Sequence, residues 1–208
     1  MPPKAKFTRE DIVEAALCIV REKGIDALTA RSLAEELGSS AQPIFTVFKN
    51  MEEVQVELKR TVKQVFNRYV RKAMEYTPAI KQVGVLMIRF ASEEPKLFQL
   101  LFMWGRKESQ NFTEHIGHLR QLTDMCLEDE CVELIQKDYG VTLEEAQALF
   151  QQVLIFTFGI GVLCATKTCV FSEEEIEELL GKEFISMLMY IKAGKLNERT
   201  LHPQKKEQ

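Results

Sequence analysis

The fold is decided by residues 28–54, which read LTARSLAEELGSSAQPIFTVFKNMEEV. Thr29 is a suitable N-cap for a first short helix, and Gly38 supplies its C-terminal stop. The apolar residues between these two positions recur at helical spacing: Leu33, Ala34 and Leu37. The stretch therefore begins with a short amphipathic helix that ends in a tight turn.

A second short helix is predicted over 40–48, with Ser39 or Ser40 as its cap. Its apolar residues follow a helical period, and we expect Ile44 and Phe48 to pack in the core of a three-helix unit. The first two helices form a helix-turn-helix, a unit whose second helix can enter the major groove of DNA.

At these residues the sequence resembles the TetR family of bacterial transcriptional regulators. The family pattern is an amphipathic first helix, a Gly, a T-x-R-x-[IL]-A helix, a second Gly, and a short aromatic-rich recognition helix that ends in Phe. The matching segments are IVEAALCIVREKG (12–24), Thr29-Ala30-Arg31-Ser32-Leu33-Ala34, Gly38, and Ser40 through Phe48. The match covers the first quarter of the chain, and the remainder agrees with the family in length and in helical character.

The resemblance implies an all-α fold. A three-helix helix-turn-helix DNA-binding head would be joined by a long helix to a helical-bundle body that binds a ligand and dimerises. We therefore expect an N-terminal DNA-binding domain over 1–55 and a C-terminal ligand-binding and dimerisation domain over 56–208, without a flexible linker. The implied function is a ligand-responsive, sequence-specific DNA-binding transcriptional regulator, a repressor released by a small apolar molecule.

Glycine and proline residues divide the chain into predicted helices. One helix over 8–23, with Thr8 near its start, precedes the helix-turn-helix. A long helix over 50–76, capped by Asn50, contains no Gly or Pro and connects the head to the body. The remaining helices are expected at 79–92, 95–104, 111–138, 142–167 and 173–193.

The charge distribution bears on DNA binding. The 208 residues are 46% hydrophobic, with a net charge of -4 and a pI of about 5.6. The first 50 residues hold seven Lys or Arg and seven Asp or Glu, so a neutral head should bind nonspecific DNA weakly. Residues 1–7 form a basic arm that either contacts DNA or stays in solvent. The neutral head keeps a second hypothesis open: a helical ligand- or protein-binding module with weak or lost DNA binding.

Several other classes find no support in the sequence. No N-terminal apolar run predicts a signal peptide, and the apolar stretch 153–165 is too short to span a bilayer. Five cysteines without secretory context predict reduced thiols in a cytoplasmic protein with no membrane partner. His115 and His118 alone make a poor metal site, so we expect no metal and no cofactor. No catalytic motif is present, and we expect no enzyme.

The predicted recognition helix departs from the family pattern. Ala41, Gln42 and Pro43 stand where relatives often carry Lys, Gly and Thr, and Met51 replaces a common Lys. Gln42 is the best candidate for reading a base edge, because its amide can pair bidentately with adenine. The predicted contacts to operator DNA are Thr29, Arg31, Ser39, Ser40, Ala41, Gln42, Pro43, Phe45, Thr46, Lys49 and Asn50.

The middle of the chain is rich in Met and aromatic residues, which can line an apolar ligand cavity or simply pack a core. The predicted ligand-binding residues are Met87, Phe90, Phe98, Phe102, Trp104, Phe150 and Phe156. Arg89 lies beside Phe90 and has two possible roles. It either faces inward and pairs with an acidic ligand, or lies on the solvated face.

The last two predicted helices carry more apolar side chains than one chain should expose. Because so large a patch is unusual on a monomer, residues 145–193 are predicted to form a homodimer interface. Gly159 and Gly161 would allow another helix to approach closely.

Overall fold

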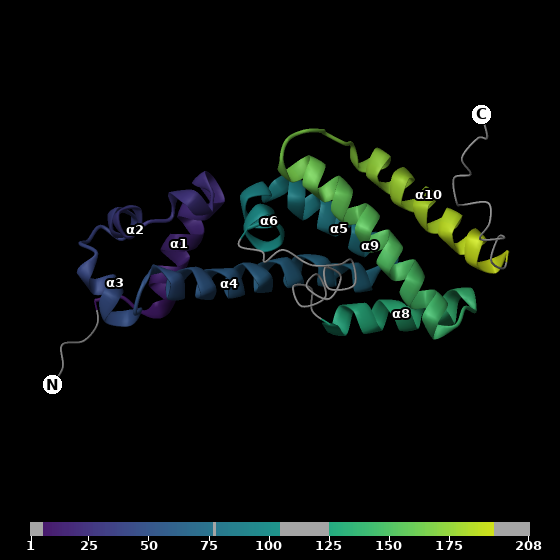
Figure 1. The fold of residues 1–208 in the computed structure, drawn as a ribbon, viewed down its shortest axis with the longest axis horizontal. Coiled ribbons are helices and arrows are strands. Elements are labelled where there is room, and N and C mark those ends of the chain that lie inside the picture. The colour runs from purple at the N-terminus through teal and green to yellow at the C-terminus, as the bar shows by residue number, and fades with distance from the viewer. Residues whose placement is uncertain (1–5, 77, 105–124, 194–208) are drawn as a thin grey trace, which may run out of the picture.

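The computed structural model describes residues 6–76, 78–104 and 125–193, and side chains in the last segment from residue 128 onward. The described chain is helical, without a strand, and the predicted all-α fold is confirmed. The helices are α1 (Arg9–Lys23), η1 (Ile25–Ala27), α2 (Ala30–Glu36), α3 (Gln42–Val47), α4 (Met51–Arg71), η2 (Lys72–Glu75), α5 (Ala79–Glu93), α6 (Pro95–Phe102), α8 (Met125–Tyr139), α9 (Leu143–Ala165) and α10 (Glu173–Lys192). Figure 1 shows an elongated molecule with α1, α2 and α3 at one end and α10 at the other.

Most helix starts follow from side-chain caps. Thr8 and Thr29 both form capping boxes. In each, the threonine hydroxyl accepts a hydrogen bond from the backbone N–H of the residue three positions later, and the side chain of that residue accepts one from the threonine N–H. The side-chain oxygen of Asn50 accepts from the N–H of Glu53 at 2.9 Å. Thr142 and Ser172 form capping boxes at the starts of α9 and α10. These five starts agree with the sequence predictions.

The start of α3 differs from its prediction. The helix begins at Gln42 with Ala41 at the N-cap, and neither Ser39 nor Ser40 caps it. A cap at Ser40 would place Pro43 at the third helical position, where the missing N–H is a usual donor to the cap. The hydroxyl of Ser39 instead lies 3.2 Å from the ammonium of Lys6.

Helix α4 connects the head to the body as one rigid element. Its buried stripe recurs every four residues and consists of Val54, Leu58, Val62, Phe66 and Val70. It packs against α1 in the head and against α5 and α6 in the body. The α-helix ends at Arg71 and continues as the 3-10 turn η2, so it is shorter than the predicted 50–76.

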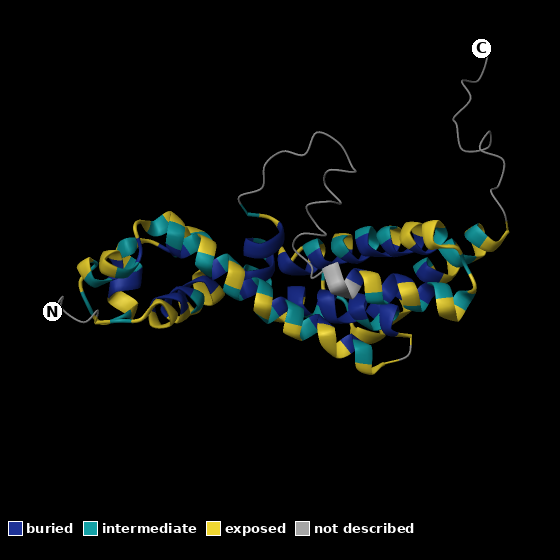
Figure 2. Cartoon of the chain, turned by 90° about the horizontal axis from the view of Figure 1, so that it is seen from below, coloured by how far each residue is buried: buried dark blue, intermediate teal, exposed yellow. Residues whose placement is uncertain are grey.

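The body is built around α5, which is packed against α4, α9 and α10. Figure 2 shows buried positions between the helices and exposed ones along their outer faces. Gly84 leaves room for a side chain of α10, because a Cβ there would lie 2.9 Å from Leu180 Cδ1. A Cβ on Gly161 would lie 3.0 Å from Phe98 Cζ. Gly161 therefore lets another helix approach closely, as predicted, and this helix is α6 of the same chain.

Helix α9 has 23 residues and is long and apolar enough to cross a membrane by length and composition alone. Half of its most apolar window is buried against the rest of the chain, as expected for a core helix. The predicted helix 111–138 is described only from Met125 to Tyr139. His115 and His118 lie outside the described residues.

Candidate nucleic-acid interface and effector region

The second helix of the helix-turn-helix presents one face to solvent. Gln42 and Thr46 are exposed, and 43% of Phe45 is exposed. On the opposite side Ile44 and Phe48 are fully buried, as predicted. Helix α3 lies at the end of the molecule remote from α10, where the body does not cover it (Figure 1).

Arg9, which no sequence pattern indicated, connects α1, α3 and α4. The guanidinium of Arg9 lies 4.1 Å from the ring centroid of Phe48 and donates to Glu53 Oε1 at 2.9 Å and to the carbonyl of Val47 at 3.3 Å. Glu53 also accepts from the backbone N–H of Lys49 at 2.7 Å. These contacts join the start of α1, the end of α3 and the start of α4.

The same contacts set the charge state of the glutamate. The N–H of Lys49, followed by the guanidinium of Arg9, lowers the pKa of Glu53 below its ordinary value of 4.5, because both stabilise the carboxylate. The negative charge of Glu53 therefore persists at neutral pH, and it holds Arg9 in place.

Several residues predicted to contact phosphate already form hydrogen bonds or ion pairs within the head. Thr29 and Asn50 serve as caps, and the hydroxyl of Thr46 donates to the carbonyl of Pro43 at 2.7 Å. Arg31 is almost fully exposed but forms an ion pair with Glu35 at 3.0 Å. Among the described residues, none forms a hydrogen bond with the side-chain amide of Gln42, which leaves its donors and acceptor free for a base edge.

The aromatic residues predicted for the effector pocket form a packed cluster. Phe66 contacts Phe90 and Phe102 edge to face, with centroids 5.3 and 5.1 Å apart. Phe98 lies 4.7 Å from Phe102 by the same measure. Since Phe90, Phe98 and Phe102 are almost completely buried here, they stabilise the core where α4, α5 and α6 meet. A role in ligand binding remains a prediction for them.

A small cavity lies beside this cluster, between α5 and α9. Met87 and Phe150 line it, together with residues that the sequence reasoning did not select: Ile80, Val83, Gly84, Val153, Leu154 and Thr157. Its volume is about 10 Å³, room for one water molecule at most. A ligand of ordinary size would have to separate the two helices.

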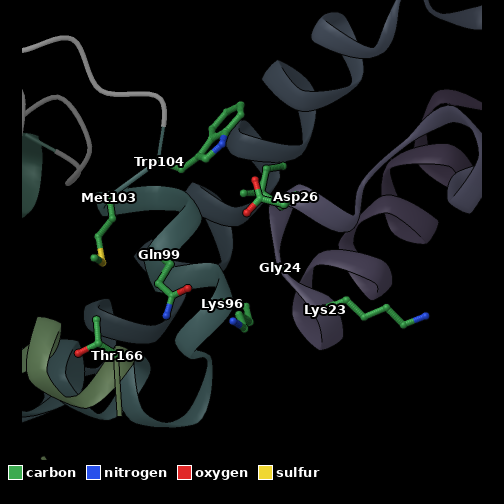
Figure 3. Close-up of a pocket in the computed structure, with 9 residues that line it drawn as sticks. Lys23, Gly24, Asp26, Lys96, Gln99, Met103, Trp104 and Thr166 are labelled. Carbon is green, nitrogen blue, oxygen red and sulfur yellow. The ribbon is translucent and has the colours of Figure 1, made fainter. Parts of the chain in front are cut away.

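Trp104 is separated from this cavity. It borders an open cleft of about 480 Å³ between the head and the body. Figure 3 shows Gln99, Met103 and Thr166 around this cleft, with Gly24 and Asp26 on the head side and Lys23 directed away. Phe156 is half-buried on α9. The predicted ligand-binding residues therefore occupy several separate environments.

Arg89 does not face the cavity. It forms an ion pair with Glu173 at the start of α10, and 38% of its side chain is exposed. Lys81, two turns earlier on α5, pairs with Glu177 at 2.9 Å. Both cations of this helix therefore bind surface acids of α10, and the inward alternative for Arg89 is wrong.

The described residues include potential metal ligands and thiols. They contain no group of three or more side chains that could hold a metal ion. The described cysteines, Cys18, Cys131, Cys164 and Cys169, are free thiols. Burial raises the pKa of Cys131 to about 12, which keeps it protonated and unreactive.

Comparison with known proteins gives the architecture a precedent. No protein-family profile and no curated protein sequence matches the chain. Among solved structures, a TetR-family transcriptional regulator from Mesorhizobium loti matches with a TM-score of 0.57 and 16% identity, over 87% of this chain and 95% of that one. The fatty acid degradation regulator FadR from Bacillus halodurans matches with a TM-score of 0.56 and 16% identity, over 94% of this chain and 99% of that one.

This chain has the fold of the TetR-family regulators. At 16% identity the likeness concerns the fold, and the head and body described above correspond to that TetR architecture over most of the length. The architecture predicted from residues 12–48 is therefore confirmed.

The outer face of the TetR-fold body carries exposed apolar side chains on α9 and α10. Ile185 is 56% exposed and Met189 is 67% exposed. Leu163 and Tyr190 are exposed as well. Gly159 leaves open space where its Cβ would be. This apolar face lies within the predicted interface 145–193, and the described chain does not cover it.

Proposed function

We propose that this protein is a ligand-responsive, sequence-specific DNA-binding transcriptional regulator that acts as a homodimer in the cytoplasm. The observation that carries the proposal is the uncovered face of α3 at the end of a TetR-fold molecule. A helix in this position can enter a major groove without a clash from the body. The domains we propose are 1–55 for DNA and 56–208 for the ligand and the dimer.

Recognition of the operator would be divided between two kinds of contact. Gln42, at the N-terminal end of α3, would read a base edge, while exposed cations such as Lys49 and Arg31 would bind phosphates. Because Arg31 also binds Glu35, it would have to exchange that partner for a phosphate. Because Arg9, Arg21 and Arg31 already form ion pairs within the protein, we expect the affinity to depend moderately on salt.

The dimer would place two heads on one DNA duplex. The exposed apolar face of α9 and α10 would pair with its copy about a two-fold axis. Two heads would then bind half-sites about 34–36 Å apart, one turn of DNA.

The effector would act by population shift. A molecule that separates α5 from α9 would displace α4, because α4 packs on α5 and continues into the head. The altered head spacing would release the operator, so the protein would be a repressor. The apolar interior supports an apolar effector, and one structural neighbour regulates fatty acid degradation.

The test is selection of bound DNA from a random-sequence library, followed by titration at about 50 and 200 mM salt. We expect one enriched palindromic sequence, with affinity that falls as salt rises. Failure to enrich any sequence at the lower salt concentration would overturn the proposal.

A second candidate is a helical ligand- or protein-binding module that no longer binds DNA. The observation that favours it is the internal engagement of Thr29, Asn50 and Arg31 within the head. Dimer formation and ligand binding without any enriched DNA sequence would support this second function.

A further inference from the structure

We propose that Thr157 is the residue that recognises the polar group of the effector, and that this effector is an uncharged, largely aliphatic molecule with one hydrogen-bonding group. Its polar end would bind in the cavity between α5 and α9. The inference rests on the proposed function, because it specifies the effector of that regulator.

The hydroxyl of Thr157 lacks a hydrogen bond. The residue is 2% exposed, and its Oγ1 has no partner in the described part of the chain. A threonine within a helix can bond to the carbonyl one turn earlier, and two others do so. Thr61 donates to the carbonyl of Glu57 at 3.2 Å, and Thr166 donates to that of Val162 at 2.7 Å. A buried hydroxyl without a partner lowers stability, so it calls for an explanation.

The surroundings of the hydroxyl favour a ligand over a water molecule. Apart from Thr157, no residue that lines the cavity has a polar side chain. A buried water requires two or more polar partners, and the surface that these residues present to the cavity is apolar. Gly84 stands opposite, and a Cβ there would lie 3.1 Å from Thr157 Oγ1. The missing side chain leaves room for the buried hydroxyl beside α5, and a molecule that separates α5 from α9 would reach it there.

The charges around the cavity exclude an anionic head group. The cations of α5, Lys81 and Arg89, are directed to Glu177 and Glu173 at the surface. In the described part of the chain, the one buried charged side chain is Glu128, an acid. A carboxylate or phosphate at Thr157 would therefore remain without a cation, at a large cost in free energy. A neutral hydroxyl or carbonyl needs one hydrogen bond, which Thr157 can supply.

The aliphatic part of the effector would occupy space opened between α5 and α9. Met87 and Leu154 line the cavity, and methionine adapts readily to new neighbours because its side chain is flexible. Insertion of an alkyl chain would bury apolar surface of the ligand, which is the main source of its affinity.

The test is isothermal titration calorimetry of the full chain with two neutral series, 1-alkanols and 2-alkanones of six to twelve carbons, and with the matching carboxylates. The variants are Thr157→Val, which keeps the shape but removes the hydroxyl, and Thr157→Ser, which keeps the hydroxyl. Thr166→Val, at the exposed C-cap of α9, is the control for loss of a threonine hydroxyl outside the cavity.

We expect the wild type, Thr157→Ser and Thr166→Val to bind neutral compounds, with carboxylates at least tenfold weaker. Thr157→Val should bind the neutral compounds at least tenfold more weakly, while its Tm equals or exceeds that of the wild type. A lower Tm for Thr157→Val would indicate a structural role and overturn the proposal. So would equal binding by this variant, tighter binding of carboxylates, or no binding of either neutral series.

Operator binding by the ligand-free protein keeps the two proposals apart. Thr157→Val should bind the selected DNA as the wild type does, because the residue lies far from α3 in the body. If DNA binds but the neutral compounds do not, this inference fails and the regulator function stands. If the neutral compounds bind but no DNA does, the ligand site at Thr157 stands and the regulator function fails.

Discussion

Arg21 and Glu94 form an ion pair between the head and the body. The Nε of Arg21 lies 3.1 and 2.9 Å from the two carboxylate oxygens of Glu94. Arg21 belongs to the last turn of α1, and Glu94 lies between α5 and α6. The pair therefore links the helix-turn-helix head to the body at a point separate from α4.

A double-mutant cycle measures this link. Arg21→Met, Glu94→Gln and the double variant should give a coupling energy of about 0.2–1 kcal/mol in urea unfolding, because the pair is partly exposed and screened by solvent. The ion pair between Arg31 and Glu35 serves as the control, because both residues belong to α2 and the pair does not connect the head to the body. We also expect Arg21→Met to change operator affinity, whereas Glu35→Gln should leave the head-to-body link unchanged. A coupling energy of zero would show that the contact does not join the two parts.

The stability provided by Glu53 should depend on pH. Its pKa is lowered in the folded protein by the Lys49 N–H and by Arg9. The contribution is therefore complete above the ordinary value of 4.5 and disappears as pH falls through the folded pKa. The pKa of Asp11, at the start of α1, is lowered in the same way, because its carboxylate accepts a hydrogen bond from the N–H of Thr8.

Thermal unfolding of Glu53→Gln tests this dependence. The variant should have a lower Tm than the wild type at about pH 7, and the difference should be smaller at about pH 3, below the ordinary pKa of 4.5. Glu36→Gln, on the exposed face of α2, is the matched control and should show little difference at either pH. A deficit in Tm that is the same at both values would exclude an electrostatic origin.

Gln42→Ala should weaken specific operator binding and relax the preference at one base position by roughly 1–3 kcal/mol. The reason is that its exposed amide stands at the first turn of α3. Fluorescence anisotropy with the selected sequence and its single-base variants provides the measurement. Gln64→Ala, exposed on α4, should bind as the wild type does. If both variants keep the wild-type preference at all positions, Gln42 reads no base.

The dimer interface is best tested at positions that do not support the monomer core. Ile185→Glu and Met189→Glu introduce charges on the exposed face of α10, where a dimer would bury them at high cost. We expect monomers with unchanged helicity and lost operator binding, measured by light scattering and circular dichroism. Val56→Glu, at an exposed position of α4, should remain dimeric. A wild-type mass near 24 kDa at micromolar concentration would contradict the prediction.

Two glycines on α9 should respond differently to alanine. The Cβ of Gly161→Ala would lie 3.0 Å from Phe98 Cζ, and Phe98 also packs against Phe102 with ring centroids 4.7 Å apart. Gly159→Ala meets no atom within 4 Å and gains the same helix propensity. Gly161→Ala should therefore be less stable than Gly159→Ala by about 1–3 kcal/mol, measured by urea unfolding. Equal stabilities would mean that Phe98 can move aside.

The sequence by itself determined the elements and their order. Thr8, Thr29 and Asn50 predicted helix starts because an N-cap satisfies backbone donors within a few residues of itself. The apolar residues of α4 recur every four positions in the sequence, and helical geometry alone decides that such positions share a face. Local chemistry of this kind is encoded in neighbouring residues and needs no knowledge of distant ones.

The tertiary structure alone decided which distant residues meet. Arg89 could have faced inward by its position in the sequence, but α10 places Glu173 beside it and holds it at the surface. Thr157 carried no recognisable pattern, because its missing hydrogen bond and its cavity exist only once α5 packs across α9. Such sites arise from contacts between residues far apart in the chain, so helical periodicity and capping cannot reveal them.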